Sequence, residues 1–402
     1  MNSGLSVETP ARTRGSAWEV LAASLRLGLS SFGGPIAHLG YYEQAYVKQR
    51  RWLDAEQYAG LVALCQLLPG PASSQTGFLI GLHRAGWAGA LAAWIGFTLP
   101  SALLMFALAV FAPQSPGPVV QALMHGLKLT AVAVVAQAVW SMARRLCPDR
   151  PRSAIAMAAA ALLLAGGGAH LQLAALVAGA LAGLVWCRTV ELPAIRLSDE
   201  VGHRTAWFAL ALFALLLFGL PLLAARTPHG PLALADIFYR SGALVFGGGH
   251  VVLPLLRDAL VPGWLSDNAF LAGYGAAQAL PGPVFAVAAY LGAASAAPEA
   301  RPLWSALALL FIFLPGLLLA VAGVSLWGRL VAVRGAAAAL AGVNAAVVGV
   351  LGAALYDPVW TSAVHGGRDA AIAVAGLLLL ERWRMPPVLL VVFCVALAGL
   401  AA

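Results

Sequence analysis

Two arginines occupy matching positions in apolar stretches of the chain. Arg26 lies in the run LRLGLSSFGGPIAHL, and Arg240 lies in the run YRSGALVFGGGHVVL, which begins 214 residues later. A guanidinium stays charged at physiological pH and presents a planar set of N–H donors that suits oxyanions. Because a charge at membrane depth costs about 3 kcal/mol on insertion scales, we expect this pair to bind an anion at a common site.

Each buried cation also has a structural interpretation. The two arginines could instead extend to the membrane surface or pair with a nearby carboxylate, such as Glu19 or Asp236. Lys128 lies in the middle of the apolar run HGLKLTAVAVVAQAV, so it either lines the same site or pairs with another group. Asn344 holds the matching position in the second half of the chain.

Glycine and proline interrupt the same stretches in both halves of the chain. A break in a helix frees backbone N–H and C=O groups, and membrane proteins tolerate these only where protein or water satisfies them. A helix that restarts after a break directs free N–H groups and about half a positive charge at the membrane centre. We therefore expect the breaks to form an anion site; kinks used for packing or gating are the alternative. The motif residues are Phe32, Gly33, Gly34, Pro35, Pro69, Gly70, Pro71, Phe246, Gly247, Gly248, Gly249, Pro281, Gly282 and Pro283.

Other polar residues flank these breaks. Gln66 and Gln278 precede the two PGP motifs by about one turn and are expected to donate to a ligand or to the broken backbone. His38 and His250 follow the glycine motifs without aligning with each other, and their protonation offers a route for proton coupling. We expect Pro71 and Pro283 to lie in the first turn of the helices that follow, where the missing N–H costs nothing.

The composition fixes the class of protein. Of the 402 residues, 61% are hydrophobic and only 10% are charged, against about 25% charged in soluble domains. Each crossing of a hydrocarbon core about 30 Å thick needs about 20 apolar residues. The sequence therefore predicts an all-α polytopic membrane protein. Its net charge of +8 fits the basic cytoplasmic loops of such proteins and does not indicate a nucleic-acid partner.

Several sequence absences narrow the chemistry. No Walker A motif is present, so ATP is not the expected energy source. The four cysteines are scattered, and no HExxH motif or close His/Cys/Asp cluster predicts a metal site. We expect no cofactor and no catalytic residue. Cations at membrane depth without matching acids favour an anionic substrate.

The two halves also match beyond the arginines. Trp52-Leu53, Leu99-Pro100 and Gly126 return in order as Trp264-Leu265, Leu314-Pro315 and Gly342, which indicates a duplicated unit of about 200 residues. Most of the 24 Lys and Arg residues fall on one side if the broken segments return to the side they started from. The full crossings are then expected at 87–112, 118–143, 153–168, 170–187, 206–225, 302–324, 336–355, 369–381 and 386–402.

This layout predicts two inverted repeats. Five crossings precede the second unit, so it enters the membrane from the opposite side, and the broken segments meet near the bilayer midplane. Whether these segments are re-entrant hairpins or broken crossings stays open. The expected organisation is a cytoplasmic tail at 1–16, a first repeat at 17–190, a loop and linker helix at 191–230, and a second, inverted repeat at 231–402.

The paired motifs FGGP…WL…QLLPGP and FGGG…WL…QALPGP resemble the chromate ion transporter family in its long, two-domain form. The resemblance implies a secondary transporter that exports chromate across the bacterial inner (plasma) membrane and gives chromate resistance, with sulfate as a related substrate. The N-terminus is expected in the cytoplasm, the lipid bilayer surrounds the chain, and a homodimer is left open. The alternatives are a sulfate or other oxyanion transporter or channel, and an enzyme that acts on a phosphorylated lipid, which would need a general base at depth.

Overall fold

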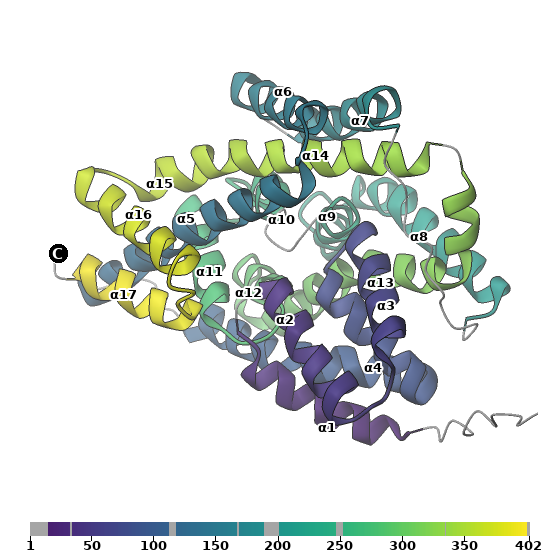
Figure 1. Cartoon of the computed structure of the whole chain (residues 1–402). Coiled ribbons are helices and arrows are strands. Elements are labelled where there is room, and N and C mark those ends of the chain that lie inside the picture. Colours follow the sequence, from purple (N-terminus) through teal and green to yellow (C-terminus); the bar gives the residue numbers. More distant parts are fainter. Residues whose placement is uncertain are drawn as a thin grey trace, which may run out of the picture.

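The chain folds into helices that pack around a centre where several of them are broken (Figure 1). The computed structural model describes residues 15–32, 34–111, 118–166, 169–188, 201–246, 252–333 and 335–399, and these contain no strand. Five helical stretches are long and apolar enough to cross a membrane: Ala72–Phe111, Gln121–Leu146, His203–Ala224, Pro298–Arg329 and Ala336–Ala363. The all-α polytopic membrane class is confirmed.

The first repeat consists of seven α-helices and one π-helix among the described residues. Polar side chains start several of them. Ser16 caps the first helix by accepting from the N–H of Glu19, and Asp54 forms a capping box with Gln57. The elements are α1 (Ala17–Ser30), α2 (Gly34–Tyr42), η1 (Glu43–Gln49), α3 (Ala55–Leu67), α4 (Ala72–Phe111), α5 (Pro118–Leu146), α6 (Arg150–Gly166) and α7 (Ala169–Trp186).

A linker helix, α8 (His203–Ala224), leads into the second repeat, which repeats the order of the first. Ser266 caps the third helix of this repeat, at the position that matches Asp54. The elements are α9 (Pro231–Ala243), α10 (Val252–Leu260), α11 (Asp267–Ala279), η3 (Val284–Ala286), α12 (Val287–Ala294), η4 (Pro298–Ala300), α13 (Arg301–Ala332), α14 (Ala336–Ala354), η5 (Leu355–Trp360), α15 (Thr361–Ala363), α16 (Gly367–Glu381) and α17 (Pro387–Gly399).

Most expected crossings agree with helices of the structure within a few residues, but α13 (Arg301–Ala332) continues well beyond the crossing expected at 302–324. The crossing expected at 87–112 is the second part of α4, which breaks at Ala85 and Gly86, where the backbone is non-helical. One expectation is wrong: Pro71 and Pro283 lie just before the helices, not in their first turns. Gln75 N–H already donates to Pro71 O, so Pro71 supplies the first helical acceptor.

Each repeat packs its opening helix on its own long helix. In the first repeat, α1 lies along α4, and a Cβ on Gly28 would lie 2.7 Å from the carbonyl oxygens of Gly96 and Phe97. In the second repeat, α9 lies along α13, and Gly242 meets the carbonyl of Ile312. Both contacts bring two backbones together at a glycine, a packing mode typical of membrane helices.

The last two helices of each repeat pack on the other repeat. Helices α6 and α7 lie against α14, whereas α16 and α17 lie against α5 (Figure 1). At Gly179 and Gly183, the backbone of α7 packs directly against the backbone of α14 at Gly342. Gly126 of α5 packs in the same way against Val395 of α17. The two repeats are therefore interlocked and bury each other's long helices.

One loop outside the membrane-spanning stretches illustrates how the helical ends are held. Asp149, between α5 and α6, accepts from the backbone N–H of Arg152 at 2.9 Å and forms an ion pair with its guanidinium. These hydrogen bonds from Arg152 hold the pKa of the Asp149 carboxyl below its ordinary value.

Candidate functional site

The broken segments of the two repeats meet through a reciprocal pair of hydrogen bonds. Gly70 N–H donates to Val245 O at 2.7 Å, and Gly282 N–H donates to Ser31 O at 2.9 Å. Gly70 and Gly282 match each other in the repeat alignment, and so do Ser31 and Val245. Each PGP motif thus satisfies the free carbonyl at the end of the other repeat's opening helix.

Each PGP motif also contacts the long helix of the other repeat, next to the proline inside that helix (Pro100 in α4, Pro315 in α13). A Cβ on Gly70 would lie 2.8 Å from the Cα of Gly316, and one on Gly282 would lie 2.8 Å from Ser101 Oγ. Both glycines have positive φ, at +119° and +97°, a region that suits residues without a Cβ. The Gln75 side chain joins this contact by donating from Nε2 to Gly316 O at 2.8 Å.

The expected arginine pair has two different environments. Arg240 forms an ion pair with Asp236, one helical turn away, and its side chain is 50% exposed. The carboxylate alternative is therefore observed for Arg240. Arg26 is exposed on α1, and Glu19 instead binds Arg84 at 3.2 Å. Neither observation tests anion binding, so the role of both arginines remains a prediction.

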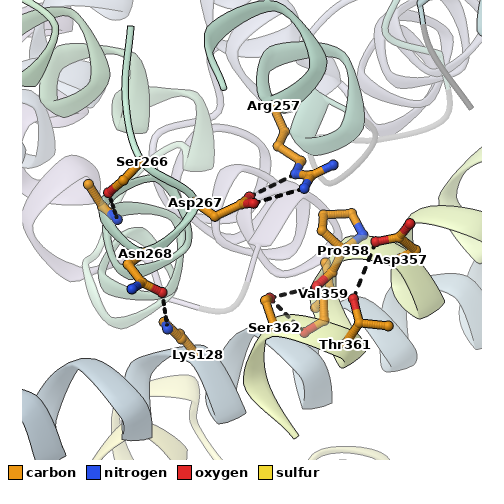
Figure 2. A network of polar contacts seen from close by, with 11 residues as sticks. Lys128, Arg257, Ser266, Asp267, Asn268, Asp357, Pro358, Val359, Thr361 and Ser362 are labelled. Carbon is orange, nitrogen blue, oxygen red and sulfur yellow. Dashed lines mark hydrogen bonds and ion pairs between the residues drawn. The ribbon is translucent and has the colours of Figure 1, made fainter. Parts of the chain in front are cut away.

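Lys128 takes part in a polar network that joins three helical segments (Figure 2). Its Nζ donates to Asn268 Oδ1 at 2.6 Å, at the start of α11. Next to it, Arg257 of α10 binds both carboxylate oxygens of Asp267, at 2.8 and 2.9 Å. The pairing interpretation of Lys128 is thus observed. Asn344, its counterpart, is buried, and its Oδ1 has no partner among the described residues.

This network lies where the repeats differ in packing. Helix α11 packs along α5, with Gly275 against the backbone of Leu127. Over the described part of the chain, α3 makes no comparable contact with α14. The same sequence unit therefore holds two different positions relative to its neighbour.

We predict that the hydrogen bond between Lys128 and Asn268 stabilises the packing of α11 on α5. Lys128→Met and Asn268→Ala should each lower the free energy of unfolding by about 1 kcal/mol, a usual value for one hydrogen bond. The double variant should lose no more than either single one, because both remove the same bond. Thermal unfolding of the purified variants measures this, and strictly additive losses would contradict the pairing.

The remaining predicted site residues are divided between buried and accessible positions. Gln278 is buried with Nε2 unpartnered, whereas Gln66 is exposed. Phe32, Gly34, Pro35, Pro69 and Phe246 are partly buried, and Pro71, Pro281 and Pro283 are buried. Gly33, Gly247, Gly248, Gly249 and His250 lie outside the described residues.

His38, one of the predicted site residues, lies in a polar layer between α2 and the start of α4. It is buried on α2, and its Nδ1 lies 3.4 Å from Ser73 Oγ in the first turn of α4. Tyr42, one turn further on α2, packs against Gly77 of α4. The neighbouring hydroxyl of Thr76 is already used, since it donates to Ala72 O at 2.8 Å. Tyr42 was not predicted; the signal that could have revealed it is a polar residue whose counterpart in the second repeat, Leu256, is apolar.

No group of three or more His, Cys, Asp or Glu side chains is placed to hold a metal ion within the described ranges. The described groups around the crossed PGP motifs are backbone N–H groups, hydroxyls and the Gln75 side-chain amide. Such a set donates hydrogen bonds, so its chemistry suits an anion that accepts them.

Comparisons with known proteins agree with this chemistry. The model of the chromate transporter family matches residues 18–186 and again residues 232–400. The chain is 30% identical to the chromate transport protein of Pseudomonas aeruginosa over 294 residues, which are 70% of this chain and 67% of the relative. It is 29% identical to a probable chromate transport protein of Synechococcus elongatus, over 67% of this chain and 66% of the relative.

A third relative, the chromate transport protein of Cupriavidus metallidurans, is 26% identical over 67% of this chain and 65% of its own length. No solved structure matches the chain. The two matches of the family model fall on the two structural repeats, one on α1–α7 and one on α9–α17. The chain belongs to the chromate transporter family.

Proposed function

We propose that this protein is a secondary transporter that exports chromate from the cytoplasm across the inner membrane and thereby gives chromate resistance. The observation that carries the proposal is the reciprocal contact of the two PGP motifs with the two glycine breaks. Crossed, broken helices at the interface of two repeats are a common place for the substrate site of secondary transporters. Family membership and the three chromate transport relatives support chromate as the substrate.

The membrane potential favours export of a dianion. One charge that moves through 100 mV changes its free energy by about 2.3 kcal/mol. Two negative charges that leave a cell at roughly 150 mV, inside negative, gain about 7 kcal/mol, which sustains a gradient of about 10⁵. Export therefore needs no ATP, whereas uptake would need strong ion coupling. Proton coupling through His38 is compatible with this scheme but is not required by it.

Transport in everted membrane vesicles tests the function. Vesicles that contain the protein should accumulate labelled chromate when the potential is positive inside, and accumulation should fall when the potential is clamped at zero. Equal or greater accumulation of sulfate would favour the broader oxyanion transporter. A protein that produces no flux of either anion contradicts the proposal.

We predict that Arg26 and Arg240 attract the anion to the site. Arg26→Ala and Arg240→Ala should each abolish chromate flux while the protein still inserts into the membrane, because a guanidinium near the breaks offsets the cost of bringing in a dianion. Arg301→Ala, at the start of α13 and outside the glycine and PGP motifs, serves as a control. Normal flux in both single variants would remove the arginines from the site.

A further inference from the structure

Six residues of the first repeat that are at most 2% exposed have a polar side-chain atom without a hydrogen-bond partner among the described residues. In Gln75 that atom is the acceptor Oε1, whereas in the other five it can donate a hydrogen bond. These five atoms are Ser31 Oγ, His38 Nε2, Tyr42 OH, Ser74 Oγ and Thr98 Oγ1. A buried polar group without a partner costs about 1–3 kcal/mol. We name these five residues the donor shell, because each of them can donate an O–H or N–H hydrogen bond.

Two members of the donor shell, His38 and Tyr42, pack on one aromatic side chain, Phe97 of α4. Their ring centroids lie 5.2 and 5.3 Å from that of Phe97, and Thr98 is the next residue. Ser31 O accepts from Gly282 N–H, and a Cβ on Gly282 would lie 3.2 Å from Phe97 O. The shell thus borders the crossing of the broken segments.

Ser74 belongs to the same layer through the fold of α4. This helix turns back on itself after Gly86, and Gly81 meets Gly89 and Ala93 of its second half. Ser74 lies two turns before Gly81, on the same helical face. That face is therefore directed toward the half of α4 that carries Phe97 and Thr98.

The second repeat builds the same layer without polar groups. At the matching positions it carries five apolar residues, and each is at most 1% exposed: Val245, Val252, Leu256, Ala286 and Phe313. Packing alone therefore does not need the five polar side chains. The first repeat bears the cost of burying them, and a ligand that accepts hydrogen bonds would offset that cost.

The start of α4 adds backbone donors to the shell. Gln75 N–H makes the first helical hydrogen bond, to Pro71 O at 2.9 Å. The amides of Ala72, Ser73 and Ser74 come before it and have no acceptor within their helix. A helix start with free amides attracts negative charge, and no aspartate or glutamate belongs to the donor shell.

We infer that the donor shell is the binding seat of the tetrahedral oxyanion, and that the seat is built by the first repeat alone. This inference rests on the proposed function. The five side chains and the first turn of α4 replace water around the four oxygens of the anion. Because the shell is buried, the anion reaches it only when α2 separates from α4, so binding is tied to a conformational change, as a carrier requires.

The test uses the purified full-length protein and two matched variants in one helical turn. Ser74→Ala installs the residue that the second repeat already has, and Thr76→Val removes a hydroxyl that its own helix already satisfies. Titration with potassium chromate should give a Kd at least tenfold higher for Ser74→Ala, equivalent to about 1.4 kcal/mol, and within twofold of the parent for Thr76→Val. The melting temperature of Ser74→Ala without chromate should be equal or higher, since an unpartnered buried hydroxyl is lost.

The outcomes separate this inference from the proposed function. If the parent protein transports chromate and Ser74→Ala and Thr98→Val both bind it normally, the seat lies elsewhere and the function stands. If the parent binds chromate through Ser74 but moves none across vesicles, the function fails and the seat stands. A lower melting temperature together with weaker binding in Ser74→Ala would mean that the hydroxyl is structural, and would overturn the inference.

Discussion

Replacing Gly70 or Gly282 with alanine is expected to abolish transport and to reduce the yield of folded protein severely. Each new Cβ would lie 2.8 Å from the opposite repeat, at Gly316 Cα or Ser101 Oγ. Overpacking costs about 1–3 kcal/mol, and the positive φ adds about 1–2 kcal/mol. Total losses of this size are a large fraction of the usual stability of a protein.

Gly86 provides the control for this experiment. Its φ is +64°, but a Cβ there would meet nothing within 4 Å. Gly86→Ala should therefore show only the strain of the backbone and keep most of its flux. Flux and detergent-extracted yield, measured for all three variants, separate strain from close contact. Equal effects at the three sites would contradict the importance of the crossed PGP motifs.

Cutting the chain between residues 200 and 201 is expected to give two fragments that fold only together. A fragment of residues 1–200 would expose the face of α5 that α16 and α17 cover, and residues 201–402 would expose the face of α14 that α6 and α7 cover. Co-expression of both fragments should restore chromate flux. Each fragment alone should be degraded or aggregate, because its glycine-lined contacts have no partner.

A cut made after folding provides the matched control. A protease site placed in the segment between α7 and α8 allows the purified protein to be cleaved in its folded state. The two pieces should remain together on size exclusion and keep their affinity for chromate. Stable, monomeric behaviour of either fragment expressed alone would show that the interlocked helices are not needed for folding.

The sequence predicted the helices and their breaks well, because both follow from local rules. Apolar runs of membrane length define the crossings, and Gly and Pro define where α1, α3, α9 and α11 end. The duplication was visible because both repeats keep the same breakers. The predicted positions of Pro71 and Pro283 were wrong by one residue. The prediction considered only the missing N–H and the fixed φ of proline, whereas both prolines lie just before the first turn, where a proline carbonyl can accept a hydrogen bond.

Contacts between the repeats could not be predicted from the sequence. The sequence predicted Gly70 and Gly282 as site residues. It could not predict which carbonyl oxygens accept their hydrogen bonds, because that depends on how the two repeats cross. Three members of the donor shell, Ser31, Tyr42 and Thr98, were not predicted, because matching the two repeats finds the residues that they share and these three differ from their counterparts. His38 was predicted as a polar site residue. Lys128 could not be assigned because its partner, Asn268, lies 140 residues away.

The unequal packing of α11 and α3 has a consequence for how the molecule moves. In the carrier proposed above, the second orientation would be the state in which α11 and α3 exchange these positions. In that exchanged state α11 leaves α5, and α3 moves onto α14, which brings Glu56 toward Asn344 in place of the Lys128–Asn268 bond. The proposed transport cycle therefore predicts a contact between α3 and α14 in its other orientation.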